Sequence, residues 1–409
     1  MKFSIPSAAW PPGSPHLPSW RGASGVTQTI ERALAQAGLH APPGLAQGVT
    51  QTIQRAFASA GLGGHASAPP AHAMEDVVDV IAREILTPRP GSADAGARAP
   101  VDDALRPGQF VSRSHASHAG TRAYKLYVPA SHAAGEPMPL VVMLHGCKQT
   151  PDDFAAGTRM NELAERLGFL VAYPAQAGHA NSSGCWNWFK PQDQGRDQGE
   201  PAVIAGITRE VAASHAVDPR RIFVAGLSAG AAMAVVLGET YPELYAAVGA
   251  HSGLPYGVAH DVPSAFAAMK GGTGALPGGV GGVYQGSPRR AANAVPTIVF
   301  HGDRDATVHP CNGAQIAKEV RTLAADAGTA PAGLDARTEH GTAPGGRAYS
   351  RTLYTDAYDQ VWVEQWLLRG AGHAWSGGSA SGSYTDPAGP DASAEMLRFF
   401  LSQARTGTA

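Results

Sequence analysis

The segment that most constrains the fold is RRIFVAGLSAGAAMAVVL, residues 220–237. Its apolar run 222–225 predicts a buried strand, and the alanine-rich run after Ser228 predicts a helix. Only a few residues separate the two, so the chain must turn sharply, and glycines at 226 and 230 avoid the clash that a β-carbon would cause there. Such a turn projects the Ser228 hydroxyl above the end of the strand, beside the free N–H groups of the helix N-terminus.

Strand and helix patterns alternate on both sides of this turn. Further strands are expected at 124–128, 140–144, 169–173, 246–250, 297–300 and 361–368. Helices are expected at 160–167, 203–215, 229–241, 264–270, 312–325 and 391–405. The alternation predicts an α/β protein whose mostly parallel sheet is covered by helices on both faces. The glycine-rich span 253–294 has the length of a lid or binding loop.

A serine hydroxyl is a weak nucleophile and needs a base that a carboxylate orients. In hydrolases with this serine turn, the acid precedes the histidine in the chain. The sequence HGDRD follows the strand 297–300, at the sheet edge where a catalytic acid belongs. We expect Asp305 to be this acid, in preference to Asp303.

The base is expected at His373, which lies between glycines in GAGHAW after the strand 361–368. A histidine in such a loop can approach the serine. With 16 histidines in the chain, most are surface or capping residues. His301 and His309 remain minor candidates for the base.

A tetrahedral intermediate also needs two backbone N–H donors for its oxyanion. We expect one from Ala229, which follows the nucleophile. The other is expected from Cys147, in the loop after the strand 140–144, where Gly146 permits a close approach.

Aromatic residues gather in CWNWF, at residues 185–189. We interpret Trp186, Trp188 and Phe189 as the wall of an apolar cleft for an acyl group or a polymer, although one ring could belong to the core. Trp375 is expected to contact the substrate as well.

Residues 1–105 differ from the rest and are predicted to form a helical, partly disordered segment before a catalytic domain at 106–409. They contain an internal repeat, GVTQTIERALAQAGL at 25–39 and GVTQTIQRAFASAGL at 48–62, followed by an amphipathic stretch at 74–86. Apolar residues recur at helical spacing in each copy. The segment consists either of short helices on linkers or of a docking element for a hydrophobic surface.

The composition of the chain argues against several classes of function. With 31 basic and 33 acidic residues, the net charge of −2 argues against a nonspecific nucleic-acid or anionic-membrane binder. No apolar run reaches the roughly 18 residues of a membrane span. The start MKFSIPSAAWPPGSPHLPSW lacks the apolar region of a signal peptide, which favours a cytoplasmic or granule-associated protein. Three cysteines form no zinc pattern, and no metal or organic cofactor is expected.

Several motifs together resemble one known family, over about residues 110–403. They are LHGCKQTPDDFAAGTRMNELAERLGFLVAYPAQ, CWNWF, AGLSAGAAMA, HSGLPYG, FHGDRDATVHPCNG and GAGHAWSGG. The chain resembles the esterase and polyhydroxybutyrate (PHB) depolymerase family, which is related to feruloyl and acetylxylan esterases.

This resemblance implies an α/β-hydrolase fold with Ser228 as nucleophile, Asp305 as acid and His373 as base. The family pattern HG-x-x-D places the acid at 305. The resemblance, with the shared location of the two residues, implies a disulfide between Cys147 and Cys185, which leaves Cys311 free. Secreted family members make an extracellular location the alternative.

The expected function is therefore that of a serine esterase that hydrolyses short-chain poly- or oligo-(3-hydroxyalkanoate) esters through an acyl-enzyme. Residues 25–86 would bind a hydrophobic polyester granule. One alternative is a carbohydrate esterase that removes feruloyl or acetyl groups. Another is a noncatalytic granule-associated protein that retains the hydrolase fold.

Overall fold

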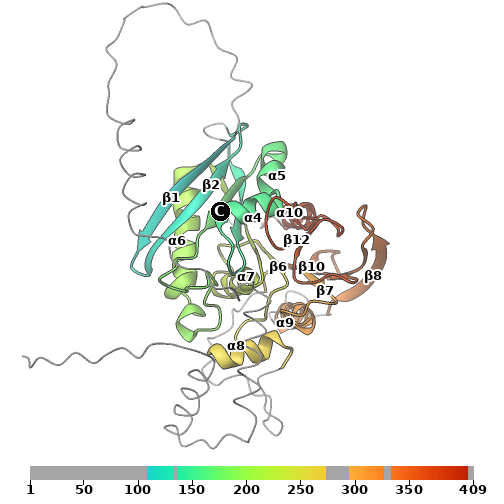
Figure 1. Cartoon of the computed structure of the whole chain (residues 1–409). Coiled ribbons are helices and arrows are strands. Elements are labelled where there is room, and N and C mark those ends of the chain that lie inside the picture. Colours follow the sequence, from blue (N-terminus) through green and yellow to red (C-terminus); the bar gives the residue numbers. More distant parts are fainter. Residues whose placement is uncertain (1–107, 133–135, 273–293, 327–332, 404–409) are drawn as a thin grey trace, which may run out of the picture. The chain divides into compact units, whose positions relative to one another are not determined.

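The computed structural model describes residues 108–132, 136–272, 294–326 and 333–403, and the segment 1–105 with its repeats lies outside them. A ten-stranded sheet with the order β1-β2-β4-β3-β5-β6-β7-β10-β9-β8 forms the centre (Figure 1). The strands are β1 (Gln109–Ser117), β2 (Gly120–Val128), β3 (Met138–Leu144), β4 (Leu170–Pro174), β5 (Val217–Leu227), β6 (Ala247–His251), β7 (Thr297–Gly302), β8 (Asp335–Thr342), β9 (Ala348–Thr355) and β10 (Val361–Leu368).

The middle of the sheet is parallel and its two sides are antiparallel. Strands β4, β3, β5, β6, β7 and β10 pair in parallel. Strand β2 is antiparallel to both β1 and β4, and β9 is antiparallel to both β10 and β8. The carboxyl ends of β5, β7 and β10 therefore lie at one edge of the sheet, and the loops that leave them meet there.

Helices cover both faces because the parallel strands are apolar on both sides. In β3, Leu140 and Val142 pack into one core cluster, while Val141 and Met143 pack into the other. The first cluster contains side chains of α6, α7, α8 and α9, and the second those of α4, α5 and α10. The helices are α4 (Pro151–Thr158), α5 (Met160–Leu167), α6 (Gly199–Ser214), α7 (Ala229–Thr240), α8 (Val262–Met269), α9 (Cys311–Asp326) and α10 (Ala392–Ser402).

This architecture confirms the predicted α/β-hydrolase fold. Every strand and helix expected within the described residues is present, with ends that differ by a few residues. The elements that were not predicted are the strands β1, β8 and β9, the helix α4, the short strands β11 (Trp375–Ser376) and β12 (Thr385–Asp386), and a 3-10 helix at Pro191–Asp193. Of the span 253–294, residues 273–293 lie outside the described ranges.

Strand β8 is the outermost strand on one side of the sheet, next to β9. Most of its side chains are exposed. Its sequence DARTEHGT contains no large apolar residue. None of the helices in the described ranges is long and apolar enough to cross a membrane.

Candidate active site

Ser228 stands between the last residue of β5 and the first residue of α7, with φ at +59°. This left-handed backbone is unfavourable for any residue with a side chain. A β-carbon at Gly226 would lie 2.4 Å from the carbonyl carbon of Gly230, and one at Gly230 would lie 2.1 Å from the oxygen of Leu144. The two glycines therefore let the turn pack against the end of β3, as the sequence predicts.

Asp305 and His373 come from neighbouring strands and are hydrogen-bonded. Asp305 follows β7 and His373 follows β10, and the His373 Nδ1 atom lies 2.7 Å from Asp305 Oδ2. The other oxygen, Oδ1, accepts the backbone N–H groups of Thr307 and Val308, each at 2.9 Å. Burial alone would raise the pKa of Asp305. The hydrogen bond from His373, the positive charge of that ring when protonated and the hydrogen bond from the Val308 N–H outweigh burial, and the pKa of Asp305 lies below its usual value. Asp305 is thus ionised and fixed in place.

Of the other sequence candidates, His301 also approaches the acid, with its Nε2 atom 3.6 Å from Asp305 Oδ2. Asp303 Oδ1 accepts the backbone N–H of Gly370 at 2.6 Å, so this carboxylate supports the loop that carries His373. The Nε2 atom of buried His301 lies 2.8 Å from the carbonyl oxygen of Val308. His309 is exposed, and its Nδ1 accepts the N–H of Cys311.

The structure thus brings Asp305 and His373 together at the sheet edge from which Ser228 projects. Among the described residues, His373 forms a hydrogen bond with Asp305 and none with Ser228. Catalytic hydrogen bonds are often long without substrate and form only in the complex, so the geometry is compatible with a triad.

The two expected oxyanion donors are available. Ala229 is the first residue of α7, where an N–H has no helical partner. The loop of Cys147 is held by Gln149, whose Oε1 accepts the N–H of Gly146 at 2.9 Å. Within the described part of the chain, no hydrogen bond occupies the Cys147 N–H.

Sequence reasoning missed the role of Gln149. Its Nε2 donates to Asp153 Oδ2 at 2.9 Å and to the Ser383 carbonyl at 3.1 Å. It therefore ties the loop of Cys147 to α4 and to the loop that follows His373. A glutamine in a polar loop carries no sequence signal for such long-range contacts.

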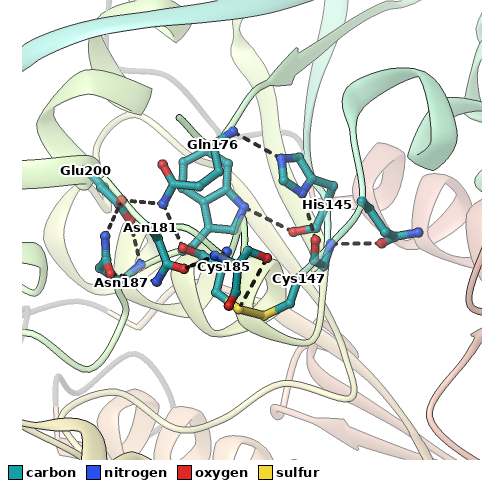
Figure 2. Close-up of a disulfide and its surroundings, with 11 residues drawn as sticks. His145, Cys147, Gln176, Asn181, Cys185, Asn187 and Glu200 are labelled. Carbon is teal, nitrogen blue, oxygen red and sulfur yellow. Dashed lines mark hydrogen bonds between the residues drawn. A yellow bond between two sulfur atoms is a disulfide. The ribbon is translucent and has the colours of Figure 1, made fainter. Parts of the chain in front are cut away.

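The predicted disulfide between Cys147 and Cys185 is confirmed, with an S–S distance of 2.05 Å. Cys311 is a free, exposed cysteine. Figure 2 shows the bridge joining the loop of His145 to the loop that contains Asn181 and Asn187. The loop of Cys147 is therefore covalently linked to a second loop.

A buried carboxylate organises this second loop (Figure 2). Glu200, at the start of α6, accepts the backbone N–H of Asn187 at 2.7 Å and its side-chain amide at 2.8 Å. Gln176 donates to Glu200 and to the carbonyl oxygen of Cys185. Burial raises the pKa of Glu200 despite these hydrogen bonds. The network fixes the position of Cys185 and, through the disulfide, that of Cys147.

Trp186 and Trp375 were expected to contact the substrate, and the structure places both rings in the interior, fully buried. The Trp186 indole N–H donates to the carbonyl oxygen of His145 at 3.1 Å, and that of Trp375 donates to Ser393 Oγ at 3.0 Å. Both rings are therefore core residues. A local aromatic run cannot show which ring faces inward.

The other two aromatic candidates form an edge-on pair. Trp188 is 5% exposed and Phe189 is half-buried, with ring centroids 5.6 Å apart. Phe189 thus keeps part of its ring surface exposed, whereas Trp188 is buried against it. Across the described ranges, no three His, Cys, Asp or Glu residues form a group that could hold a metal ion.

Comparisons with known proteins identify the family of this sequence. The family described as esterase PHB depolymerase matches residues 122–340. Poly(3-hydroxyalkanoate) depolymerase C of Paucimonas lemoignei is 32% identical over 67% of this chain and 64% of its own length. A probable acetylxylan esterase A of Aspergillus fumigatus is 28% identical over 52% of this chain and 57% of its own.

This chain thus spans roughly 57–64% of the length of these two relatives. The acetyl xylan esterase from Aspergillus awamori superposes on 73% of this chain and 100% of its own, with a TM-score of 0.51 and 22% identity. This structural similarity supports the assignment of the α/β-hydrolase fold. By the family match over residues 122–340, the chain belongs to the esterase PHB depolymerase family.

Proposed function

We propose that the chain is a carboxylic ester hydrolase that acts through an acyl-enzyme on Ser228. The observation that carries this proposal is the hydrogen bond between His373 and the ionised Asp305, at the sheet edge from which a strained serine turn projects. Family membership supports the same reaction class.

In the proposed mechanism, Asp305 holds the Nδ1–H of His373 and leaves Nε2 unprotonated as the base. Nε2 takes the hydroxyl proton of Ser228 while the oxygen attacks the ester carbonyl. The N–H groups of Cys147 and Ala229 bind the negatively charged oxygen of the tetrahedral intermediate. His373 then gives the proton to the departing alcohol, and water releases the acid by the same steps.

Short-chain 3-hydroxyalkanoate polyesters or oligoesters are the proposed substrates. The supporting observation is the similarity to poly(3-hydroxyalkanoate) depolymerase C. A second candidate is acetyl or feruloyl ester cleavage on plant polysaccharide, which the similarity to acetylxylan esterase A and to a feruloyl esterase B favours.

The experiment compares initial rates on 3-hydroxybutyrate oligomers, acetylated xylan and methyl ferulate, with Ser228→Ala as the blank. Polyester activity predicts the highest kcat/KM on the oligomers. Faster hydrolysis of the xylan or the ferulate would assign the second function. If the wild-type protein hydrolyses none of them and leaves p-nitrophenyl butyrate intact, the noncatalytic granule protein is the correct interpretation.

We also propose that the protein works in an oxidising compartment, because thiols stay reduced in the cytosol and the Cys147–Cys185 disulfide would not persist there. This favours the extracellular alternative over the cytoplasmic one. Granule binding through residues 25–86 remains a proposal about residues outside the described ranges.

A further inference from the structure

His251 is the last residue of β6, the strand between the serine strand β5 and the acid strand β7. Its backbone carbonyl accepts the N–H of Ser228 at 2.9 Å. The strained serine turn is therefore tied to the end of the neighbouring strand by this residue.

The side chain of His251 reaches the loop that carries the catalytic histidine. Its Nε2 accepts the backbone N–H of Ser376 at 3.0 Å, and Ser376 lies three residues beyond His373. Its Nδ1 lies 3.3 Å from the hydroxyl oxygen of Ser252. Because Nε2 must accept from a backbone N–H, the ring proton belongs on Nδ1.

The ring of His251 also contacts β7, the strand that leads to the proposed acid Asp305. The imidazole stacks on Phe300 of β7, with centroids 5.7 Å apart and an interplanar angle of 10°. It also stacks on Trp375 at 5.2 Å. Phe300 lies five residues before Asp305. The backbone carbonyl of His251 therefore holds Ser228, and its ring contacts the supports of the other two proposed triad members.

The environment keeps this imidazole neutral. His251 is fully buried, and burial, together with the charges of His301 and His373, lowers its pKa to about 3, although Asp305 acts in the opposite direction. The lone pair of Nε2 is therefore available to the Ser376 N–H at any pH at which an esterase works.

We propose that His251 is a positioning residue that fixes the loop of His373 relative to Ser228. The inference rests on the proposed function and adds a residue to it. Without the Nε2 acceptor, the Ser376 N–H is left buried and unpaired, which is unfavourable, and the loop must move to satisfy it. A shift of the base by about 1 Å lowers the rate roughly 100-fold.

The experiment separates the acceptor from the ring with three variants of the full chain. His251→Phe keeps the stacking and removes the acceptor, and His251→Asn is too short to reach Ser376. His251→Gln places an amide oxygen near the position of Nε2. For p-nitrophenyl butyrate we expect kcat to fall on the order of 10- to 100-fold in the first two, with KM within a few-fold. The Gln variant should recover most of the rate.

The matched control is Tyr245→Phe. Tyr245 is fully buried just before β6, at the opposite end of that strand, and its hydroxyl lies 2.9 Å from Thr208 Oγ1. Removing it deletes a buried hydrogen bond far from the site. We expect a lower Tm with wild-type kcat.

Rates are normalised to the fraction of Ser228 that a serine-directed phosphonate labels. A wild-type kcat in His251→Phe, or equal kcat values for the Asn and Gln variants, would overturn the positioning role. If the Phe variant does not fold, the kcat values of the Asn and Gln variants are enough to test the positioning role. A wild-type protein that neither hydrolyses the ester nor reacts with the phosphonate instead overturns the proposed function, and the positioning role with it.

Discussion

The Nδ1 atom of His373 lies 2.7 Å from Asp305 Oδ2, whereas Asp303, only two residues earlier, binds the N–H of Gly370. This difference predicts unequal effects of the same substitution. Asp305→Asn removes the charge that orients the base and should lower kcat by about 10⁴-fold. Asp303→Asn keeps an oxygen for Gly370 and should change kcat only a few-fold. Initial rates on p-nitrophenyl butyrate check the order, and the reverse order would reassign the acid.

Ser228→Ala should abolish hydrolysis while the fold persists, because the turn depends on the glycines at 226 and 230. Triad members act as a unit, so we expect a loss on the order of 10⁴- to 10⁶-fold in kcat. Peptide mapping of phosphonate-treated wild-type protein should find the label on Ser228, and a label on any other residue contradicts the nucleophile assignment.

Breaking the disulfide with Cys185→Ser should lower both stability and kcat. The bridge closes a loop with a sequence separation of 38, which the chain-entropy model values at about 3–4 kcal/mol. Release of the loop also frees the proposed oxyanion donor Cys147. Cys311→Ser is the matched control, since that thiol is exposed and unbridged, and should change neither quantity. Thiol titration of denatured wild-type protein without reductant should count one thiol, and a count of three would contradict the bridge.

The stability should fall as the pH drops below about 6.5. Burial lowers the pKa of His251 to about 3, and those of His301 and His145 also lie below the usual value. Below the unfolded-state pKa, the unfolded chain therefore binds protons that the folded chain excludes. His251 alone should remove roughly 2 kcal/mol of unfolding free energy between pH 6.5 and pH 5. Urea unfolding at both pH values measures this, and His251→Gln should show a flatter dependence. An unchanged slope in that variant would refute the assignment.

A chain shortened to residues 106–409 should keep kcat/KM on p-nitrophenyl butyrate within a few-fold, because all proposed catalytic residues lie downstream. It should lose adsorption to PHB granules if the apolar residues of the segment 25–86 bind them. Equal adsorption by both chains, measured by sedimentation with granules, would refute the docking role.

The sequence predicted the strands and helices whose burial shows in the pattern of apolar residues along the segment itself. Strands such as β3 and β5 are continuous apolar runs because both of their faces are covered. Strands β8 and β9 could not be recognised in this way, since they lie at the side of the sheet with few fully buried residues. Helix α4 does carry a local signal, because Thr150 caps it and Pro151 occupies its first turn.

For the site, residues with a local motif were predictable and residues defined by distant contacts were not. Ser228 sits in a turn that only glycines permit, so its pattern is specific. Gln149 and His251 depend on partners such as Ser383 and Ser376, more than 100 positions away. The burial of Trp186 is likewise set by tertiary packing.

The exposed strand β8 has a consequence for many copies of the protein crowded together. An open strand edge invites pairing with a strand from another molecule, which leads to aggregation. Here the edge carries Asp335 and Arg337, both exposed, with Glu339 paired to Arg337. An incoming strand would have to desolvate these charges, so the sheet ends at β8 and resists extension into fibrils.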